Sequence, residues 1–268
     1  MVFIPRSIII KVRMKAISKN LLVIMTLTTA ELKSRYRNTW AGLLWVIINP
    51  LMMFAVHSLI FKYIMKIDID DYFVFLLGGL IPWIFISSTL NMTCYSFITS
   101  REVLLSFQIN PLAILGAKVI DNFINFIIPF VFLFIILSFT QSFNVIGVLL
   151  LPLSMIPLVL GTFFLVLSLA TLQVYFRDTQ YILGFLLSIS YFLTPIFYPE
   201  QMVPEGFRFL LNFNPFYILI KPFQIALWSF DMQLYFLALF QSLFCSIIIC
   251  LIALFIWKKR KNELYLHI

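Results

Sequence analysis

The chain has 268 residues, of which 62% are hydrophobic and 11% are charged, and its formal net charge is +8. A soluble domain carries roughly 25% charged residues, so the composition excludes an ordinary water-soluble globular protein. Uncharged apolar runs long enough to cross a bilayer, about 20 residues each, predict an all-α integral membrane protein with a single transmembrane domain over residues 1–268.

The first predicted element is an amphipathic helix at about residues 20–38. Apolar side chains recur there at helical spacing, whereas most charged ones, among them Glu31, Arg35 and Arg37, fall elsewhere around the helix. Such a helix lies on the membrane surface. It serves either as an anchor whose basic residues meet lipid phosphates or as a docking element for a partner, and the pattern leaves both roles open.

Six membrane spans are predicted after this helix. The stretch from 122 to 176 has no charged residue and is too long for one span, so the polar turn at 140–144 divides it into two. The six spans are expected at about 42–64, 72–98, 117–139, 145–172, 180–198 and 232–257.

The basic residues indicate how these spans are oriented. With six spans both termini lie on one side of the membrane, and 15 of the 19 Lys and Arg residues fall on that side. Because basic residues are enriched in cytoplasmic loops, both termini and the turns at 99–118 and 173–180 are expected in the cytoplasm. The positive charge then reflects topology, and no nucleic-acid partner is predicted.

The second cytoplasmic turn, TSREVLLSFQINPL at 99–112, places the charged pair Arg101 and Glu102 between two apolar spans. A short helix is predicted there, and Pro111 is expected to keep it from running into the next span. Its apolar face would be formed by Val103, Leu104, Phe107 and Ile109. This helix either rests on the membrane or is the element on which a soluble partner pushes.

The outer segment at about 200–230 is too apolar for a solvated loop, and its uncharged pieces are too short to cross the membrane. Two short helices that dip into the outer leaflet are predicted. Asn214 followed by Pro215 is typical of a helix start and predicts where the second begins.

Catalytic groups are scarce in the sequence. The chain has two histidines, His57 and His267, and no G-x-x-x-x-G-K-[ST] phosphate-binding motif. Asp121 follows Lys118 by three residues, and the two are expected to neutralise each other near the cytoplasmic end of the third span. No enzymatic site, no metal and no cofactor bound by this chain is predicted.

Four ordered stretches resemble the membrane subunit of type 2 ABC exporters for cell-surface polysaccharide. They are LKSRYRNTWAGLLWVIINPLMMF, SREVLLSFQINPLA, VYFRDTQYIL and PIFYPEQMVPEGFRFLLNFNPF. The resemblance runs from about residue 20 to the C-terminus. It implies a bacterial inner-membrane permease in which two copies of the chain join two copies of a separate ATPase subunit that binds ATP and Mg²⁺.

The resemblance also assigns roles to segments. It makes 99–112 a coupling helix that sits in a cleft of the ATPase, 20–38 an interface helix and 200–230 outer gate helices. Where family members often carry Arg about ten residues beyond the Asn-Pro pair, this chain has Gln224, which leaves the details of the gate open. The candidate ATPase-coupling residues are Arg101, Glu102, Leu104, Phe107, Asn110 and Pro111.

In this family the first and fifth spans line a pathway between the two copies. Aromatic faces there suit the C–H faces of a sliding sugar chain, although Trp and Tyr also form interface belts and Phe commonly faces lipid. The candidate pathway residues are Trp40, Trp45, Phe54, His57, Arg177, Tyr191, Phe192, Phe197 and Tyr198.

Two of these candidates have simpler interpretations. His57 shares a helical stripe with Pro50, Phe54 and Phe61, which suits a hydrogen-bonded packing residue as well as a pathway residue. Arg177 stands before Asp178 in the turn ahead of the fifth span. It either forms a local ion pair there or, as the resemblance suggests, lies near the ATPase or a lipid pyrophosphate.

The sequence and the resemblance together predict export of a lipid-linked polysaccharide, such as O-antigen, capsule or teichoic acid. The alternatives are a type 2 ABC exporter of a small lipid or drug, an integral-membrane transferase acting on polyprenyl-linked sugars, and an ion-coupled carrier. The last two would need clustered or deeply buried ionisable groups, which the sequence lacks.

Overall fold

The computed structural model describes residues 6–37, 42–67, 69–107, 109–140 and 144–268. Within these ranges all the regular elements are helices, which confirms the predicted all-α membrane fold. Five helical stretches among the described residues are long and apolar enough to cross a membrane. They are Trp45–Ile64, Tyr72–Thr93, Pro111–Phe132, Val145–Tyr175 and Met232–Arg260.

The predicted fifth span is represented by α8 (Thr179–Leu193), which has 15 residues and is shorter than the other five. The helix ends because the chain turns extended at Thr194 and continues without helical structure through Tyr198. At about 1.5 Å of rise per residue, 15 residues cover only part of a bilayer.

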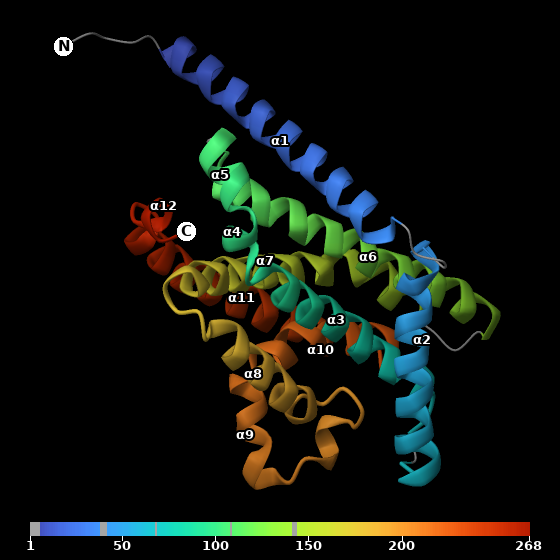
Figure 1. Ribbon diagram of the computed structural model, residues 1–268. Coiled ribbons are helices and arrows are strands. Elements are labelled where there is room, and N and C mark those ends of the chain that lie inside the picture. Colours follow the sequence, from blue (N-terminus) through green and yellow to red (C-terminus); the bar gives the residue numbers. More distant parts are fainter. Residues whose placement is uncertain (1–5, 38–41, 68, 108, 141–143) are drawn as a thin grey trace.

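The N-terminal helix α1 (Arg6–Tyr36) is longer than expected, since it begins at Arg6 and not near residue 20. It runs beside α6 (Pro111–Thr140) along one side of the molecule (Figure 1). The hydroxyl of Thr28 bonds to the carbonyl of Ala117 at 3.3 Å, and Gly116 faces Ile24. The α1 helix is therefore packed on the bundle.

The core of the molecule surrounds the short helix α10 (Pro215–Leu227), which packs against α3 (Tyr72–Thr93), α7 (Val145–Tyr175) and α11 (Met232–Arg260). Asn214 starts α10 as predicted, because its Oδ1 accepts hydrogen bonds from the backbone N–H groups of Phe216 and Tyr217 at 3.0 and 3.2 Å. A Cβ on Gly147 would lie 2.0 Å from the carbonyl oxygen of Ala226, so α7 and α10 approach closely at this glycine.

Two groups of short elements lie at the two sides of this core, and the first contributes Phe97, Leu104 and Leu264 to it. On one side, α4 (Ser96–Thr99) and α5 (Arg101–Phe107) form the turn between α3 and α6, near the C-terminal α12 (Leu264–His267). On the other side lie η3 (Glu200–Met202) and α9 (Glu205–Phe213). Figure 1 shows α5 and α9 on opposite sides of the molecule.

The peripheral helix α2 (Trp45–Ser58) follows η1 (Gly42–Leu44) and continues into the π-helical turn η2 (Leu59–Ile64). It lies at the edge of the bundle in Figure 1. Of the most apolar 18 residues within Trp45–Ile64, only 6% are buried in the protein. The helix α8 is also largely exposed, with only Leu183 and Leu187 buried.

Candidate functional site

The turn between α3 and α6 presents a short exposed helix, α5. Arg101 and Glu102 are exposed at its start, and the ring of Phe107 is 72% exposed at its end. Leu104 is 1% exposed and faces the bundle. Of the expected apolar face, Leu104 packs on the bundle and Phe107 is exposed, while Ile109 lies beyond the end of α5.

Asn110 and Pro111 belong to the start of α6 and lie beyond α5. The Oδ1 of Asn110 accepts a hydrogen bond from the backbone N–H of Leu112 at 3.0 Å, and Pro111 is the first, buried residue of α6. Proline suits that position because its missing N–H would have no intrahelical partner there. The pair separates α5 from α6 and fixes the direction in which α6 leaves the turn.

The C-terminal end of α1 is tied to α6 by polar contacts. The guanidinium of Arg35 forms an ion pair with the carboxylate of Asp121, which is 1% exposed, and its Nη1 donates to Oδ1 of Asn122 at 3.3 Å. One turn further along α6, the hydroxyl of Tyr36 donates to Oδ1 of Asn125. These contacts fix the end of α1 against the middle of α6.

The expected pairing of Lys118 with Asp121 is wrong. Lys118 lies 3.4 Å from the carboxylate of Glu31, and Asp121 pairs with Arg35. Because α1 runs alongside α6, Lys118 and Asp121 each have an opposite charge within ion-pair distance on the neighbouring helix. Arg37 is exposed beyond the last of these contacts.

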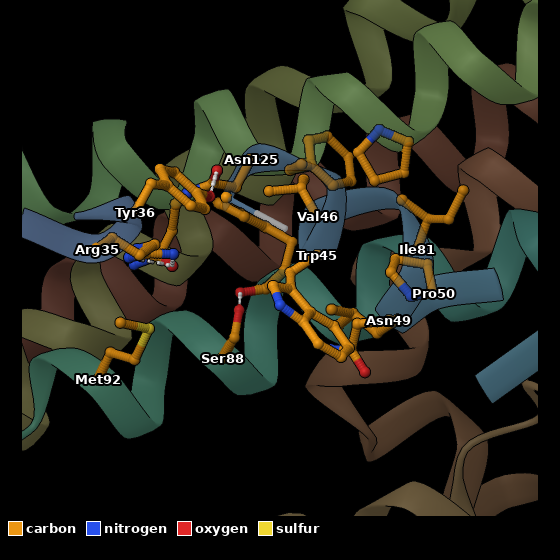
Figure 2. Close-up of a pocket in the computed structure, with 16 residues that line it drawn as sticks. Arg35, Tyr36, Trp45, Val46, Asn49, Pro50, Ile81, Ser88, Met92 and Asn125 are labelled. Carbon is orange, nitrogen blue, oxygen red and sulfur yellow. Dashed lines mark hydrogen bonds between the residues drawn. The ribbon is translucent and has the colours of Figure 1, made fainter. Parts of the chain in front are cut away.

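Next to this junction lies a cavity of about 330 Å³ between α1, α2, α3 and α6. Figure 2 shows Arg35, Tyr36 and Asn125 on one side and Pro50 and Ile81 on another, with Trp45 and Asn49 from α2 between them. Burial raises the pKa of Tyr36, while the adjacent Arg35 acts in the opposite direction. The cavity thus joins a polar end, where Arg35 is ion-paired with Asp121, to an apolar end, which suits an amphipathic ligand.

An aromatic cluster connects α2 to α8 and to the segment that follows it. His57 stacks on Phe197 at 4.6 Å between ring centroids, and Phe197 stacks on Phe61 at 4.9 Å. The His57 Nδ1 donates to the carbonyl of Met53 at 2.5 Å, so in the neutral imidazole Nε2 accepts from the hydroxyl of Tyr191 at 2.6 Å. His57 is a hydrogen-bonded packing residue that links the two peripheral helices.

The other pathway candidates are spread over several environments. Trp45 is exposed and lines the cavity, Phe54 packs edge-on against Phe73 at 4.8 Å, and Phe192 is exposed on α8. Tyr198 donates to the carbonyl of Phe192 at 2.7 Å, whereas Phe197 is fully buried. Trp40 lies outside the described residues.

Arg177 is exposed in the turn before α8, and its carbonyl accepts a hydrogen bond from Nε2 of Gln173 at 2.9 Å. No ion pair between Arg177 and Asp178 occurs among the residues that the structure describes. The local pair considered from the sequence is therefore not formed, and the Arg177 side chain is exposed at the surface.

Sequence reasoning missed the cluster made by Arg35, Tyr36, Asp121, Asn122 and Asn125. A signal was present, because positions 121, 122 and 125 place three polar residues on adjoining turns of an otherwise apolar span. Polar residues inside a span mark contacts with another helix or a functional site. The partners on α1 are 86 residues or more away in sequence, so periodicity alone does not identify them.

Comparison with known proteins gives consistent matches over most of these elements. A family model described as "ABC-2 type transporter" matches residues 23–228. The "O-antigen export system permease protein RfbA" of Klebsiella pneumoniae is 28% identical over 243 residues, which cover 89% of this chain and 92% of that protein. A protein of the same name from Myxococcus xanthus is 27% identical over 204 residues, covering 75% and 78%. The "Polysialic acid transport protein KpsM" of Escherichia coli is 26% identical over 189 residues, covering 69% and 73%.

Proposed function

The chain belongs to the ABC-2 type transporter family, and from this premise we propose that it is the membrane subunit of an ATP-driven exporter of lipid-linked polysaccharide. The observation that carries the proposal is the match of the chain to two kinds of polysaccharide transport protein, the O-antigen and the polysialic acid proteins. The substrate would cross the bacterial inner membrane from the cytoplasmic to the outer side, with both termini of the chain in the cytoplasm.

We infer that a separate ATPase supplies the energy, since these 268 residues contain no phosphate-binding loop and the similar O-antigen export protein of Klebsiella pneumoniae is named a permease. Two ATPase subunits would bind ATP and Mg²⁺ and dock on α5 of two permease copies. The exposed ring of Phe107 and the exposed charges of Arg101 and Glu102 support α5 as the docking element. Buried Leu104 would transmit the displacement of α5 to the bundle as a rigid-body movement.

The cavity at the α1–α6 junction suits the lipid-linked end of the substrate. Arg35 and the amides of Asn49 and Asn125 offer hydrogen-bond donors to phosphate oxygens, while Pro50 and Ile81 offer apolar contacts to a lipid chain. The ion pair of Arg35 with Asp121 leaves donors on the planar guanidinium for a further acceptor. The glycan itself would pass along the exposed aromatic faces of α2 and α8 between two copies of the chain.

The docking role is tested by the double variant Glu102→Arg with Phe107→Ala. Membrane insertion should stay at the wild-type level, whereas surface polysaccharide should be lost and less ATPase should co-purify with the permease. Leu149→Ala is the matched control, since this side chain is 73% exposed but lies on α7, outside both α5 and the segment 200–230. Normal export in the double variant would refute the coupling role of α5.

The proposed dimer, with α2 and α8 at its interface, is tested by disulfide cross-linking in a variant whose three native cysteines are replaced by alanine. Val56→Cys on α2 combined with Phe185→Cys on α8 places thiols on two exposed helical faces. We expect a covalent dimer on oxidation in membranes. The control pair replaces Phe185→Cys with Leu149→Cys on the exposed face of α7 and should remain monomeric. Equal cross-linking of both pairs would contradict the assignment of α2 and α8 to the interface.

A further inference from the structure

A second cavity, of about 170 Å³, lies on the side of the molecule away from α5. It is enclosed by η3, α10, the first turns of α11 and the first turn of α3. The mechanism proposed above does not use it, since it is separate from the cavity at the α1–α6 junction. Its polar side chains include Glu200, Gln201, Lys221 and Gln241.

The charged groups of this cavity neutralise each other. The ammonium of Lys221 lies 2.8 Å from Oε2 of Glu200, and the buried hydroxyl of Tyr217 donates to the same carboxylate. Burial alone would raise the pKa of Glu200, but the hydrogen bonds from Lys221 and Tyr217 together outweigh it and lower the pKa. The wall therefore presents an ionised pair with no net charge, which favours an uncharged ligand over an anion or a cation.

The aromatic wall of the cavity consists of Trp228 and Phe75. The indole N–H of Trp228 donates to the carbonyl of Asp70 at 2.7 Å, and its ring meets that of Phe75 at 4.9 Å and 69°. Because the N–H is used, the indole offers a ligand an apolar surface whose orientation is fixed. Fixed aromatic surfaces beside polar groups suit ligands that have both C–H faces and hydroxyl groups.

Three glutamines complete the lining. Gln224 is held in place by a hydrogen bond from its Nε2 to the carbonyl of Pro195 at 2.8 Å, whereas Gln201 and Gln241 are exposed at the cavity. An amide offers both donors and an acceptor, as does a sugar hydroxyl. The combination of amides, a neutralised ion pair and a fixed aromatic ring matches the chemistry of a neutral sugar ring.

We propose that this outer cavity binds one residue of an uncharged glycan, with its C–H face on Trp228 and its hydroxyls on Glu200, Lys221 and Gln241. The proposal rests on the proposed function for the origin of the glycan, which would reach the cavity as it leaves the pathway between the copies. A bound sugar there holds the emerging chain on the outer side and opposes backsliding.

The test uses the full chain with its ATPase subunit in nanodiscs of phosphatidylcholine and phosphatidylglycerol, without ATP. Glucose, galactose, mannose and N-acetylglucosamine are added one at a time, and binding is followed by saturation-transfer NMR. At least one of these sugars should bind to the wild type. Its affinity for the Trp228→Leu and Gln241→Leu variants should be lower by a factor of ten or more. Gln241 is exposed, so its variant is expected to fold even if Trp228→Leu does not.

The matched control is Trp257→Phe, which alters a tryptophan that packs on Phe97 away from the cavity and should leave binding unchanged. Absence of binding by all four sugars, or equal binding by the Gln241→Leu variant, would overturn the inference. Displacement of the bound sugar by glycerophosphoethanolamine at lower concentration would also overturn it, because the cavity would then be a lipid headgroup site.

The proposed function is tested separately, by measuring the polysaccharide on the surface of cells that lack this chain. If polysaccharide still reaches the surface there, the proposed function fails whatever the NMR result. If export requires the chain but the sugars do not bind, only the outer cavity is wrongly assigned.

Discussion

The helices α2 and α3 are both apolar and both long enough, α2 with its η2 extension, to cross a membrane, yet they have opposite surroundings. Of the 18 most apolar consecutive residues in α3, 78% are buried within the chain. The corresponding value for α2 with η2 is 6%. Since lipid tails are as apolar as leucine, hydrophobicity alone gives no reason for one helix to pack and the other to stay outside.

Small residues account for part of the difference. Gly78 and Gly79 of α3 face α10, and a Cβ on Gly79 would lie 2.8 Å from Nε2 of Gln224 and 3.3 Å from Cα of Ile196. The sequence WVIINPLMMFAVHS of α2 has no glycine. Close backbone approach therefore holds α3 in the core, while α2 keeps large exposed side chains for lipid or a second copy.

The largest contrast is expected when one leucine is truncated in each helix. Leu80→Ala in α3 removes a fully buried side chain and should lower the free energy of unfolding by about 3 kcal/mol, because it leaves a cavity. Leu59→Ala at the start of η2, where the side chain is 55% exposed, should cost no more than about 0.5 kcal/mol. Unfolding in mixed detergent micelles measures both, and equal losses would contradict the contrast.

A smaller effect is expected at the ion pair that ties α1 to α6 beside the cavity. Arg35→Met leaves the buried carboxylate of Asp121 without its partner and should destabilise the protein by about 2 kcal/mol, below the usual cost because Arg35 is partly exposed. Adding Asp121→Asn should restore most of the loss. Arg37→Met, an exposed arginine two residues along, is the control and should melt like the wild type. Failure of Asp121→Asn to rescue would show that the loss has another cause.

The sequence predicts what is local in this fold. Charge-free runs predict the membrane class, and Asn214 with Pro215 predicts the start of α10 because capping involves neighbouring residues. It does not predict the pairing of Arg35 with Asp121 or of His57 with Tyr191, because those partners are 86 and 134 residues apart. Hydrophobicity does not separate α2 from α3 either, since both are apolar, and Gly78 and Gly79 are the sequence feature that marks α3 for close packing.

The contact between the peripheral helices α2 and α8 should contribute less to the free energy of unfolding than the Leu80 side chain or the Arg35–Asp121 ion pair. His57→Phe keeps the stacking on Phe197 but removes the hydrogen bonds with Tyr191 and with the carbonyl of Met53, which should cost about 1.5 kcal/mol. Tyr191→Phe removes only the bond between the two side chains and should cost about 1 kcal/mol. The double variant should cost little more than His57→Phe alone, because both changes remove that shared bond. Additive losses in this cycle would indicate that the two residues act independently.

The smallest effect is expected where the core helix α10 meets η3, and it appears as a dependence of stability on pH. Contacts with Lys221 and Tyr217 lower the pKa of Glu200 from its ordinary value of 4.5 in the folded state, so the folded protein binds the proton less readily than the unfolded chain. The contribution is present above pH 4.5 and is lost as the pH falls through the lower folded value. Because both side chains are partly exposed, it should not exceed about 1 kcal/mol.

Comparing the wild type with Glu200→Gln isolates this contribution. The difference in melting temperature between the two should be largest near neutral pH and should shrink below pH 4.5, because an amide does not titrate in this range. Glu205→Gln alters an exposed carboxylate on α9 and should melt like the wild type throughout. A difference between wild type and Glu200→Gln that stays constant as the pH falls would mean that shape, and not charge, joins η3 to α10. The outer cavity would then lack the ionised pair on which its neutral wall depends.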